Sequence, residues 1–138
     1  MDKIELIKKH EGLRLKPYRC TANKQTIGYG RNIEDNGISK EEATIMLCND
    51  IRESEDALAS KISNWEELSE VRKAVLINMV FNLGWPRLSK FKRALAAVEG
   101  GDFKRASAEM LDSRWARQVG NRAIELSDMM NANKWGKE

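Results

Sequence analysis

The 138-residue chain is poor in proline, cysteine and histidine. Its two prolines favour a mainly helical protein, because proline interrupts helices and inner strands. Cys20 and Cys48 are too few for a disulfide framework, and we expect both thiols to stay reduced. His10 is the only histidine and no CxxC pair is present, so neither a metal ion nor an organic cofactor is expected.

Long apolar runs and a strong excess of one charge are also absent. Residues 1–9 interleave charged with apolar side chains, so we expect neither a signal peptide nor membrane insertion, and accumulation in the cytoplasm of the cell that makes the protein. The net charge of +3 is spread among 21 acidic residues, and no nucleic-acid-binding motif is present. Nucleic acid is therefore not expected as a partner.

What is present begins with an acid at the end of a short helix. Residues 2–11 have the pattern of an amphipathic helix that Gly12 can end. Ile4, Ile7 and Glu11 share one stripe of this helix, so the carboxyl group of Glu11 is expected to face protein. Partial desolvation favours the protonated form of such an acid, which makes Glu11 a candidate general acid.

A small hairpin is predicted to follow. A polar turn at residues 22–25 separates two short strands, and the second strand runs from Thr26 to Gly30. Thr26, Gly28 and Gly30 then share one face of that strand. Because two of these residues have no side chain, something flat could approach the backbone closely there.

The rest of the chain is predicted to be helical. Ser39 and Glu42 match a capping box, and a further helix start is expected soon after Ser63. Residues 71–83 are apolar around most of the helix circumference, which predicts a buried central helix. Other helices are expected from Ser89 to about Val98, and at about 102–112 and 122–132.

These elements make one mainly helical α+β domain. A small lobe of about residues 12–60 holds the hairpin and a connecting helix, and a larger lobe of about residues 61–138 also takes in the helix at residues 2–11. A chain of this length can bury a substantial core, and we expect a monomer.

Three short motifs are the most specific feature of the sequence. Residues 10–14 read His-Glu-Gly-Leu-Arg, residues 18–20 read Tyr-Arg-Cys, and residues 26–30 read Thr-Ile-Gly-Tyr-Gly. In this order they resemble the active-site signature of the phage-type lysozymes, or endolysins, a family that pairs a glutamate with an aspartate or cysteine and with a threonine. Segments 74–81 and 113–123 resemble the family's central helix and C-terminal motif. The resemblance implies a lysozyme-like fold.

The resemblance also implies an activity, hydrolysis of the β-1,4 bond between N-acetylmuramic acid and N-acetylglucosamine in peptidoglycan, which lyses the host cell. Glu11 is then the general acid, and Cys20 and Thr26 activate or position water. Most members of the family have aspartate where this chain has Cys20. Attack by water with inversion is favoured, and direct attack by Cys20 with retention stays open.

Cys20 needs help to act as an anion, because a reference thiol has a pKa of about 8.5. The cations that could lower the pKa of this thiol are Lys16, Arg19, Lys24 and Arg31. Arg122 matches the family's arginine near the catalytic glutamate, and this pair would favour ionised Glu11. We expect bound substrate to weaken the pair. By the resemblance, substrate contacts are expected at Gly28, Gly30, Asn32 and Phe81, with core packing as the alternative for Phe81.

The partner implied by the resemblance is the glycan strand of peptidoglycan. A muramidase made in the cytoplasm reaches that strand only after a holin-type protein has opened the membrane. Two alternative functions stay open. The chain could be a lytic transglycosylase, which leaves a 1,6-anhydro product, or a lysozyme-fold protein that binds peptidoglycan without cleaving it because Cys20 has replaced the acid.

Overall fold

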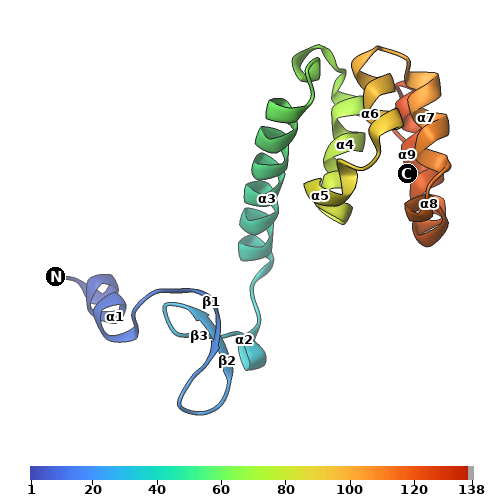
Figure 1. Cartoon of the computed structure of the whole chain (residues 1–138). Coiled ribbons are helices and arrows are strands. Elements are labelled where there is room, and N and C mark those ends of the chain that lie inside the picture. The colour runs from blue at the N-terminus through green and yellow to red at the C-terminus, as the bar shows by residue number, and fades with distance from the viewer. Residues whose placement is uncertain (137–138) are drawn as a thin grey trace. The chain divides into compact units, whose positions relative to one another are not determined.

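The chain folds into two compact units, Met1–Met46 and Leu47–Glu138. The structure, a computed structural model, describes residues 1–136 (Figure 1). We refer to the two parts as the N-terminal unit and the C-terminal unit. None of the helices in residues 1–136 has the length and apolar character needed to span a bilayer.

The N-terminal unit combines short helices with a small antiparallel sheet. Its first helix follows Asp2, whose side chain accepts a hydrogen bond from the Glu5 backbone N–H, and ends at Gly12 as predicted. The sheet has the strand order β1-β2-β3. The elements are α1 (Lys3–Glu11), β1 (Arg14–Arg19), β2 (Gln25–Gly28), β3 (Arg31–Asn32), α2 (Ile33–Asn36) and the beginning of α3 (Lys40–Lys61).

The third strand corrects the prediction of a two-stranded hairpin. Thr26 of β2 pairs with Asn32 of β3, so a second tight turn follows the first. The prediction that Gly30 shares a strand face with Thr26 is wrong, because β2 ends at Gly28 and Gly30 lies in this second turn. Gly28 and Gly30 have φ angles of 71° and 78°, which most other residues adopt only with strain. The glycines therefore turn the chain from β2 into β3.

Helix α3 begins with the predicted capping box. The Ser39 hydroxyl accepts a hydrogen bond from the Glu42 backbone N–H at 3.1 Å, and the Glu42 carboxylate accepts one from the Ser39 N–H at 2.8 Å. Arg31 donates to both oxygens of the same carboxylate. The start of α3 is thereby tied to β3 within the N-terminal unit.

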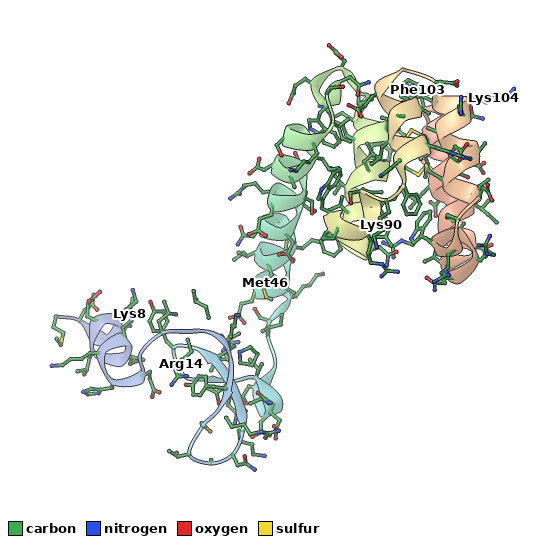
Figure 2. All side chains as sticks on the ribbon, in the orientation of Figure 1. Lys8, Arg14, Met46, Lys90, Phe103 and Lys104 are labelled. Carbon is green, nitrogen blue, oxygen red and sulfur yellow. The ribbon has the colours of Figure 1, made fainter. Side chains whose placement is uncertain are left out.

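The C-terminal unit is a helical bundle around one apolar core. Helix α4 buries Val71, Val75, Leu76, Met79, Val80 and Leu83, which confirms the predicted central helix. Helix α7 packs against both α6 and α9, and the side chains of the bundle are drawn in Figure 2. After α3 the elements are η1 (Trp65–Glu67), α4 (Glu70–Leu83), α5 (Trp85–Leu88), α6 (Lys92–Glu99), α7 (Phe103–Leu111), α8 (Arg114–Val119) and α9 (Asn121–Ala132).

Some details of the helix prediction are wrong. The start expected after Ser63 gives only the single turn η1, and α4 is instead capped by Ser69, which accepts from the Arg72 N–H. Ser89 does not start a helix, because it closes α5 and α6 begins at Lys92. Helix α8 is too short to have been recognised from its pattern. The mainly helical α+β class is nevertheless confirmed.

Candidate active site

Glu11 is the last residue of α1, and its carboxyl group lies against the backbone of Gly30. A β-carbon at Gly30 would sit 2.5 Å from Glu11 Oε2 and 2.8 Å from Cδ, so this approach requires glycine. The apolar stripe of α1 is not covered within the N-terminal unit, where Ile4 and Ile7 are 55% and 54% exposed. That this stripe packs against protein stays a prediction, and within the N-terminal unit the Glu11 carboxyl group faces Gly30.

Thr26 and Cys20 come together at the closed end of the β1–β2 hairpin. Tyr18 lies opposite Thr26, so Cys20, two residues further on, belongs to the same face. Thr26 is 3% exposed and is the only buried residue among residues 1–46. Its hydroxyl donates to the Lys24 carbonyl at 2.9 Å, and the Cys20 backbone N–H donates to the same carbonyl at 3.0 Å. One backbone oxygen thus holds both candidate residues.

The pKa of the Cys20 thiol is lowered by hydrogen bonds from its own hairpin. The contributors are the backbone of Lys24, then the Thr26 hydroxyl, then the backbone of Ala22. A hydroxyl carries one hydrogen, so Thr26 donates either to the Lys24 carbonyl or to the Cys20 thiolate. Ionisation of Cys20 therefore competes for the hydrogen that Thr26 otherwise gives to the backbone.

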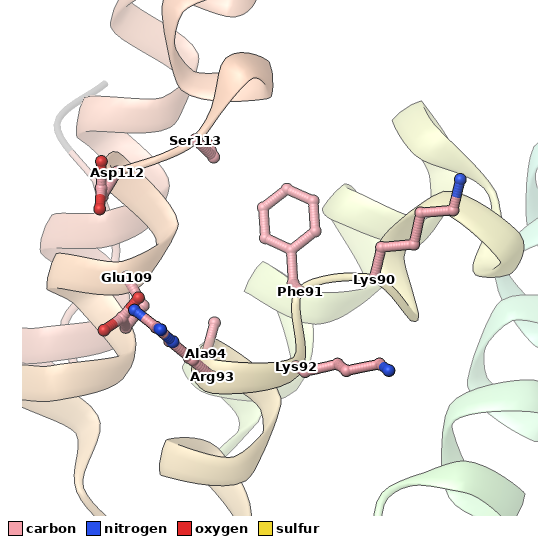
Figure 3. A pocket seen from close by; sticks show the side chains of 8 residues that line it. All are labelled: Lys90, Phe91, Lys92, Arg93, Ala94, Glu109, Asp112 and Ser113. Atoms are coloured by element: carbon pink, nitrogen blue, oxygen red, sulfur yellow. The ribbon is translucent and has the colours of Figure 1, made fainter.

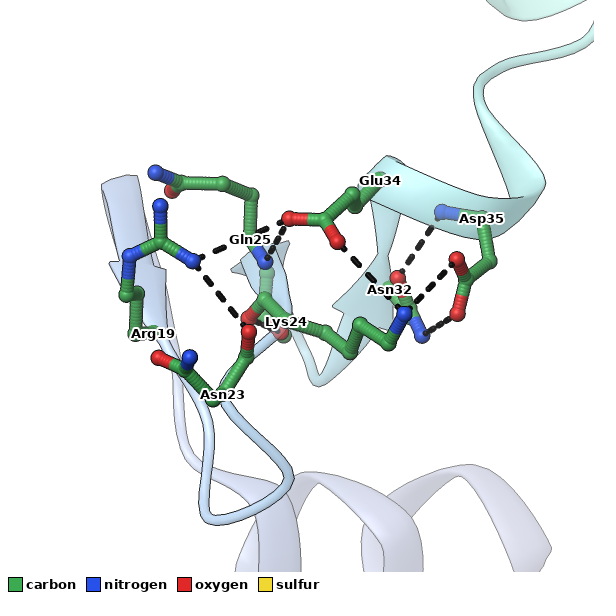
Figure 4. A network of polar contacts seen from close by, with 8 residues as sticks. Arg19, Asn23, Lys24, Gln25, Asn32, Glu34 and Asp35 are labelled. Atoms are coloured by element: carbon green, nitrogen blue, oxygen red, sulfur yellow. Dashed lines mark hydrogen bonds and ion pairs between the residues drawn. The ribbon is translucent and has the colours of Figure 1, made fainter.

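Three of the four cations expected to act on Cys20 bind carboxylates: Arg19, Lys24 and Arg31. Arg19 and Lys24 each place a nitrogen near the Glu34 carboxylate, at 3.8 Å and 3.5 Å (Figure 4). Arg31 pairs with Glu42 instead. The hydrogen bonds described above, rather than these cations, account for the lowered pKa of the thiol.

Asn32, an expected substrate contact, caps helix α2. Its Oδ1 accepts from the Asp35 backbone N–H at 3.1 Å, and its Nδ2 donates to the Asp35 carboxylate at 2.9 Å. These bonds give Asn32 a structural role that the sequence analysis did not identify. Its contact with substrate, and those of Gly28 and Gly30, stay predictions.

Phe81 and Arg122 line one groove of the C-terminal unit, with a volume of about 360 Å³. Phe81 is 49% exposed and lies outside the core, so the alternative of core packing is wrong. The Nε and one terminal nitrogen of Arg122 donate to the side-chain oxygen of Asn78 at 2.9 Å and 2.7 Å. The pairing of Arg122 with Glu11 stays a prediction.

Sequence reasoning missed Asn78, the residue that orients Arg122. Its position three residues before Phe81 places both side chains on one face of α4, which was the available signal. Leu47, Ile51, Ala74 and Ile77 complete the groove. The groove is therefore mostly apolar, with one hydrogen-bonded polar pair.

A second hollow of the C-terminal unit lies around Phe91 (Figure 3). Its volume is about 380 Å³, and none of the predicted site residues lines it. Its charged lining residues are the basic Lys90, Lys92 and Arg93 and the acidic Glu109 and Asp112. The mixture of charges favours no particular sign of ligand.

Comparison with known proteins agrees with the motifs. Residues 8–131 match the family model described as phage lysozyme. The chain is 35% identical to an endolysin of Acyrthosiphon pisum secondary endosymbiont phage 1, over 83% of this chain and 77% of that protein. It is 30% identical to the probable T4-type lysozyme 2 of Dictyostelium discoideum, over 86% and 87% of the two chains.

The chain is also similar to part of a much larger protein. All of this chain aligns, at 28% identity, with part of the pre-baseplate central spike protein of Enterobacteria phage T4. The aligned part is only 29% of that protein. The match to the family model includes both the N-terminal motifs and most of the helical unit. The chain therefore belongs to the phage lysozyme family.

Proposed function

We propose that this chain is a muramidase that hydrolyses the β-1,4 bond between N-acetylmuramic acid and N-acetylglucosamine in peptidoglycan. Membership of the phage lysozyme family supports the proposal. The observation that carries it is the arrangement of the hairpin, in which the Lys24 carbonyl binds both the Thr26 hydroxyl and the Cys20 N–H in the same compact unit as Glu11.

Glu11 acts as the general acid in this proposal. Its proton passes to the glycosidic oxygen as that oxygen leaves the anomeric carbon, and positive charge develops on the sugar ring. The close approach of the carboxyl group to Gly30 limits where that group can point. A positioned acid of this kind contributes about 10²- to 10⁴-fold to the rate.

A water molecule attacks the opposite face of the sugar. Because Thr26 donates its hydrogen to the Lys24 carbonyl, the lone pairs of its hydroxyl are left to accept a hydrogen bond from that water. The Cys20 thiolate takes the second proton of the water as its oxygen bonds to the anomeric carbon. The backbone hydrogen bonds from Lys24 and Ala22 that lower the pKa of Cys20 enlarge the thiolate fraction without using the Thr26 hydrogen. The product therefore has the inverted configuration at the anomeric carbon.

The first test is mass spectrometry of the fragments released from purified peptidoglycan. Wild type should release reducing N-acetylmuramic ends, and Glu11→Gln should lose this release by about 100-fold or more. Glu5→Gln, a charge change on the same helix, is the matched control and should behave as wild type. Release of 1,6-anhydro ends would instead establish a transglycosylase, and binding without fragments would establish a non-catalytic module.

The second test concerns the role of Cys20. Cys20→Asp should keep turnover and move the rising limb of kcat/KM to lower pH, because aspartate has a reference pKa of about 3.9. Cys20→Ser should lose most turnover, because serine does not ionise in this range. A serine variant equal to wild type at every pH would contradict the base role. If ¹H NMR shows a first-formed product with retained configuration, Cys20 attacks the sugar directly.

The wider setting follows from the same proposal. The partner is the glycan strand of peptidoglycan, and a holin-type protein gives the enzyme access to it from the host cytoplasm. Gly28, Gly30, Asn32 and Phe81 are the proposed substrate contacts. If so, Phe81→Ala should raise KM for glycan fragments and leave the mass of the released products unchanged.

A further inference from the structure

Glu34, in the first turn of α2, contacts both strands of the hairpin that carries Cys20 and Thr26 (Figure 4). Its carboxylate lies 3.8 Å from an Arg19 nitrogen and 3.5 Å from Lys24 Nζ. The same carboxylate accepts a hydrogen bond at 3.3 Å from the Gln25 backbone N–H, in the residue just before Thr26.

Asp35 reinforces this contact from the same helix. Its carboxylate binds Lys24 Nζ at 3.3 Å and is oriented by the Asn32 side chain at 2.9 Å. The Asn32 and Lys24 hydrogen bonds hold the pKa of Asp35 below its ordinary value. Arg19 also donates to the Asn23 carbonyl at 3.2 Å, across the turn. Helix α2 thus holds the turn that supplies the Lys24 carbonyl.

We propose that Glu34 is a positioning residue of the muramidase site, holding the Lys24 carbonyl in place for Thr26 while keeping the charges of Arg19 and Lys24 away from Cys20. The inference rests on the proposed function, because it assigns Glu34 a role in that reaction. Glu34 does not touch the reacting atoms and acts through the hairpin.

Two physical effects separate this role from ordinary surface pairing. A single exposed ion pair contributes little to stability, but here Glu34 bonds a backbone N–H as well as two cations, so its loss removes contacts at both ends of the turn at once. Without Glu34, Arg19 has no carboxylate partner among residues 1–136, and Lys24 has Asp35 alone. These less neutralised charges would then favour the Cys20 thiolate. Glu34 and Asp35 are the acids that the structure sets against these two cations.

The first arm of the test measures Cys20 ionisation without requiring turnover. In a Cys48→Ser background, which removes the other free thiol, Glu34→Gln should speed the alkylation of Cys20 by iodoacetamide. The expected increase at pH 7 is roughly threefold, because the alkylation rate follows the thiolate fraction. The increase should shrink in about 1 M salt, which screens exposed charges. Glu41→Gln, another charge change in the N-terminal unit, is the matched control. Unchanged alkylation in Glu34→Gln would overturn the inference.

The second arm measures hydrolysis across pH. Glu34→Gln should lower the plateau of kcat by about tenfold while moving its rising limb to lower pH, and Glu34→Asp should recover part of the plateau. A variant that merely lost stability would lower activity without moving the limb. If the plateau kcat of Glu34→Gln equals that of wild type, the inference is overturned. If wild type itself releases no fragments, the proposed function fails, and the alkylation arm still decides whether Glu34 shields the thiol.

Discussion

The N-terminal unit and the C-terminal unit are each stabilised by a different kind of internal contact. The C-terminal unit buries a continuous set of apolar side chains that runs from Leu58 to Met130. In the N-terminal unit only Thr26 is buried, and its elements are joined by polar contacts such as the Arg31–Glu42 pair. The chemistry of the proposed site therefore lies in the unit without an apolar core. Its geometry should respond to charge changes that leave the helical unit folded.

The largest expected effect is the loss of an apolar side chain from the C-terminal core. Leu76 is 2% exposed, and Leu76→Ala should lower the free energy of unfolding by about 3 kcal/mol, because it removes packing and leaves a cavity. Leu15→Ala, the same change at a 79% exposed position of β1, should cost less than about 0.5 kcal/mol. Urea denaturation followed by circular dichroism measures both. Equal costs would show that the contrast between the units is wrong.

The next effect separates activity from stability within the N-terminal unit. Gly30→Ala should lower kcat by about tenfold or more, because the new β-carbon would displace the Glu11 carboxyl group. Gly37→Ala is the matched control, since Gly37 also has a positive φ, 61°, but has open space where a β-carbon would lie. Both variants strain the backbone, because both glycines have a positive φ. If the two variants lose activity equally, the contact between Gly30 and Glu11 has no part in catalysis.

A smaller effect is expected for a polar contact inside the C-terminal unit. The buried Ser107 hydroxyl donates to the Ser127 carbonyl at 2.8 Å and joins α7 to α9. Ser107→Ala should cost about 1 kcal/mol of unfolding free energy, well below the cost at Leu76. Ser54→Ala, which removes an exposed bond within α3, is the control and should be nearly neutral. A cost as large as that of the leucine variant would mean that this unit also depends on polar contacts.

The smallest effect on stability should follow acid titration of the N-terminal unit. The Arg31 hydrogen bonds, with further bonds from Ser39, lower the pKa of Glu42 to about 2. Because the folded pKa lies below the ordinary value of 4.5, the stabilisation is present above about pH 5 and is lost as pH falls towards 2. NMR titration of the Glu42 carboxyl should show this low midpoint, and Arg31→Gln should raise it. Lys40→Gln should leave the midpoint in place, and a midpoint unaffected by Arg31→Gln would contradict the assignment.

Local patterns predicted much of this fold. Gly12 ends α1, Ser39 and Glu42 form their capping box, and α4 is buried, because each depends on neighbours a few residues apart. The two-residue strand β3 and the short helix α8 were missed, since neither is long enough to show a period.

The candidate site was likewise predictable from the sequence only in part. The spacing of Glu11, Cys20 and Thr26 was readable because a family signature is a property of sequence order, and the comparisons confirm that family. No residue pattern indicated that the Lys24 carbonyl accepts hydrogen bonds from both Cys20 and Thr26, because every residue has the same backbone oxygen. Nor could the sequence show that Arg19 and Lys24 pair with the Glu34 carboxylate rather than with the Cys20 thiolate.

The sequence by itself determined the family, the mainly helical class and the residues proposed for catalysis, all of which follow from residue types at fixed spacings. Only the tertiary structure decided how those residues are held. Gly30 receives the carboxyl group of Glu11, and Glu34 binds Arg19 and Lys24. These contacts join residues that chain folding brings together, and their free energies depend on distances and exposure that no local pattern contains.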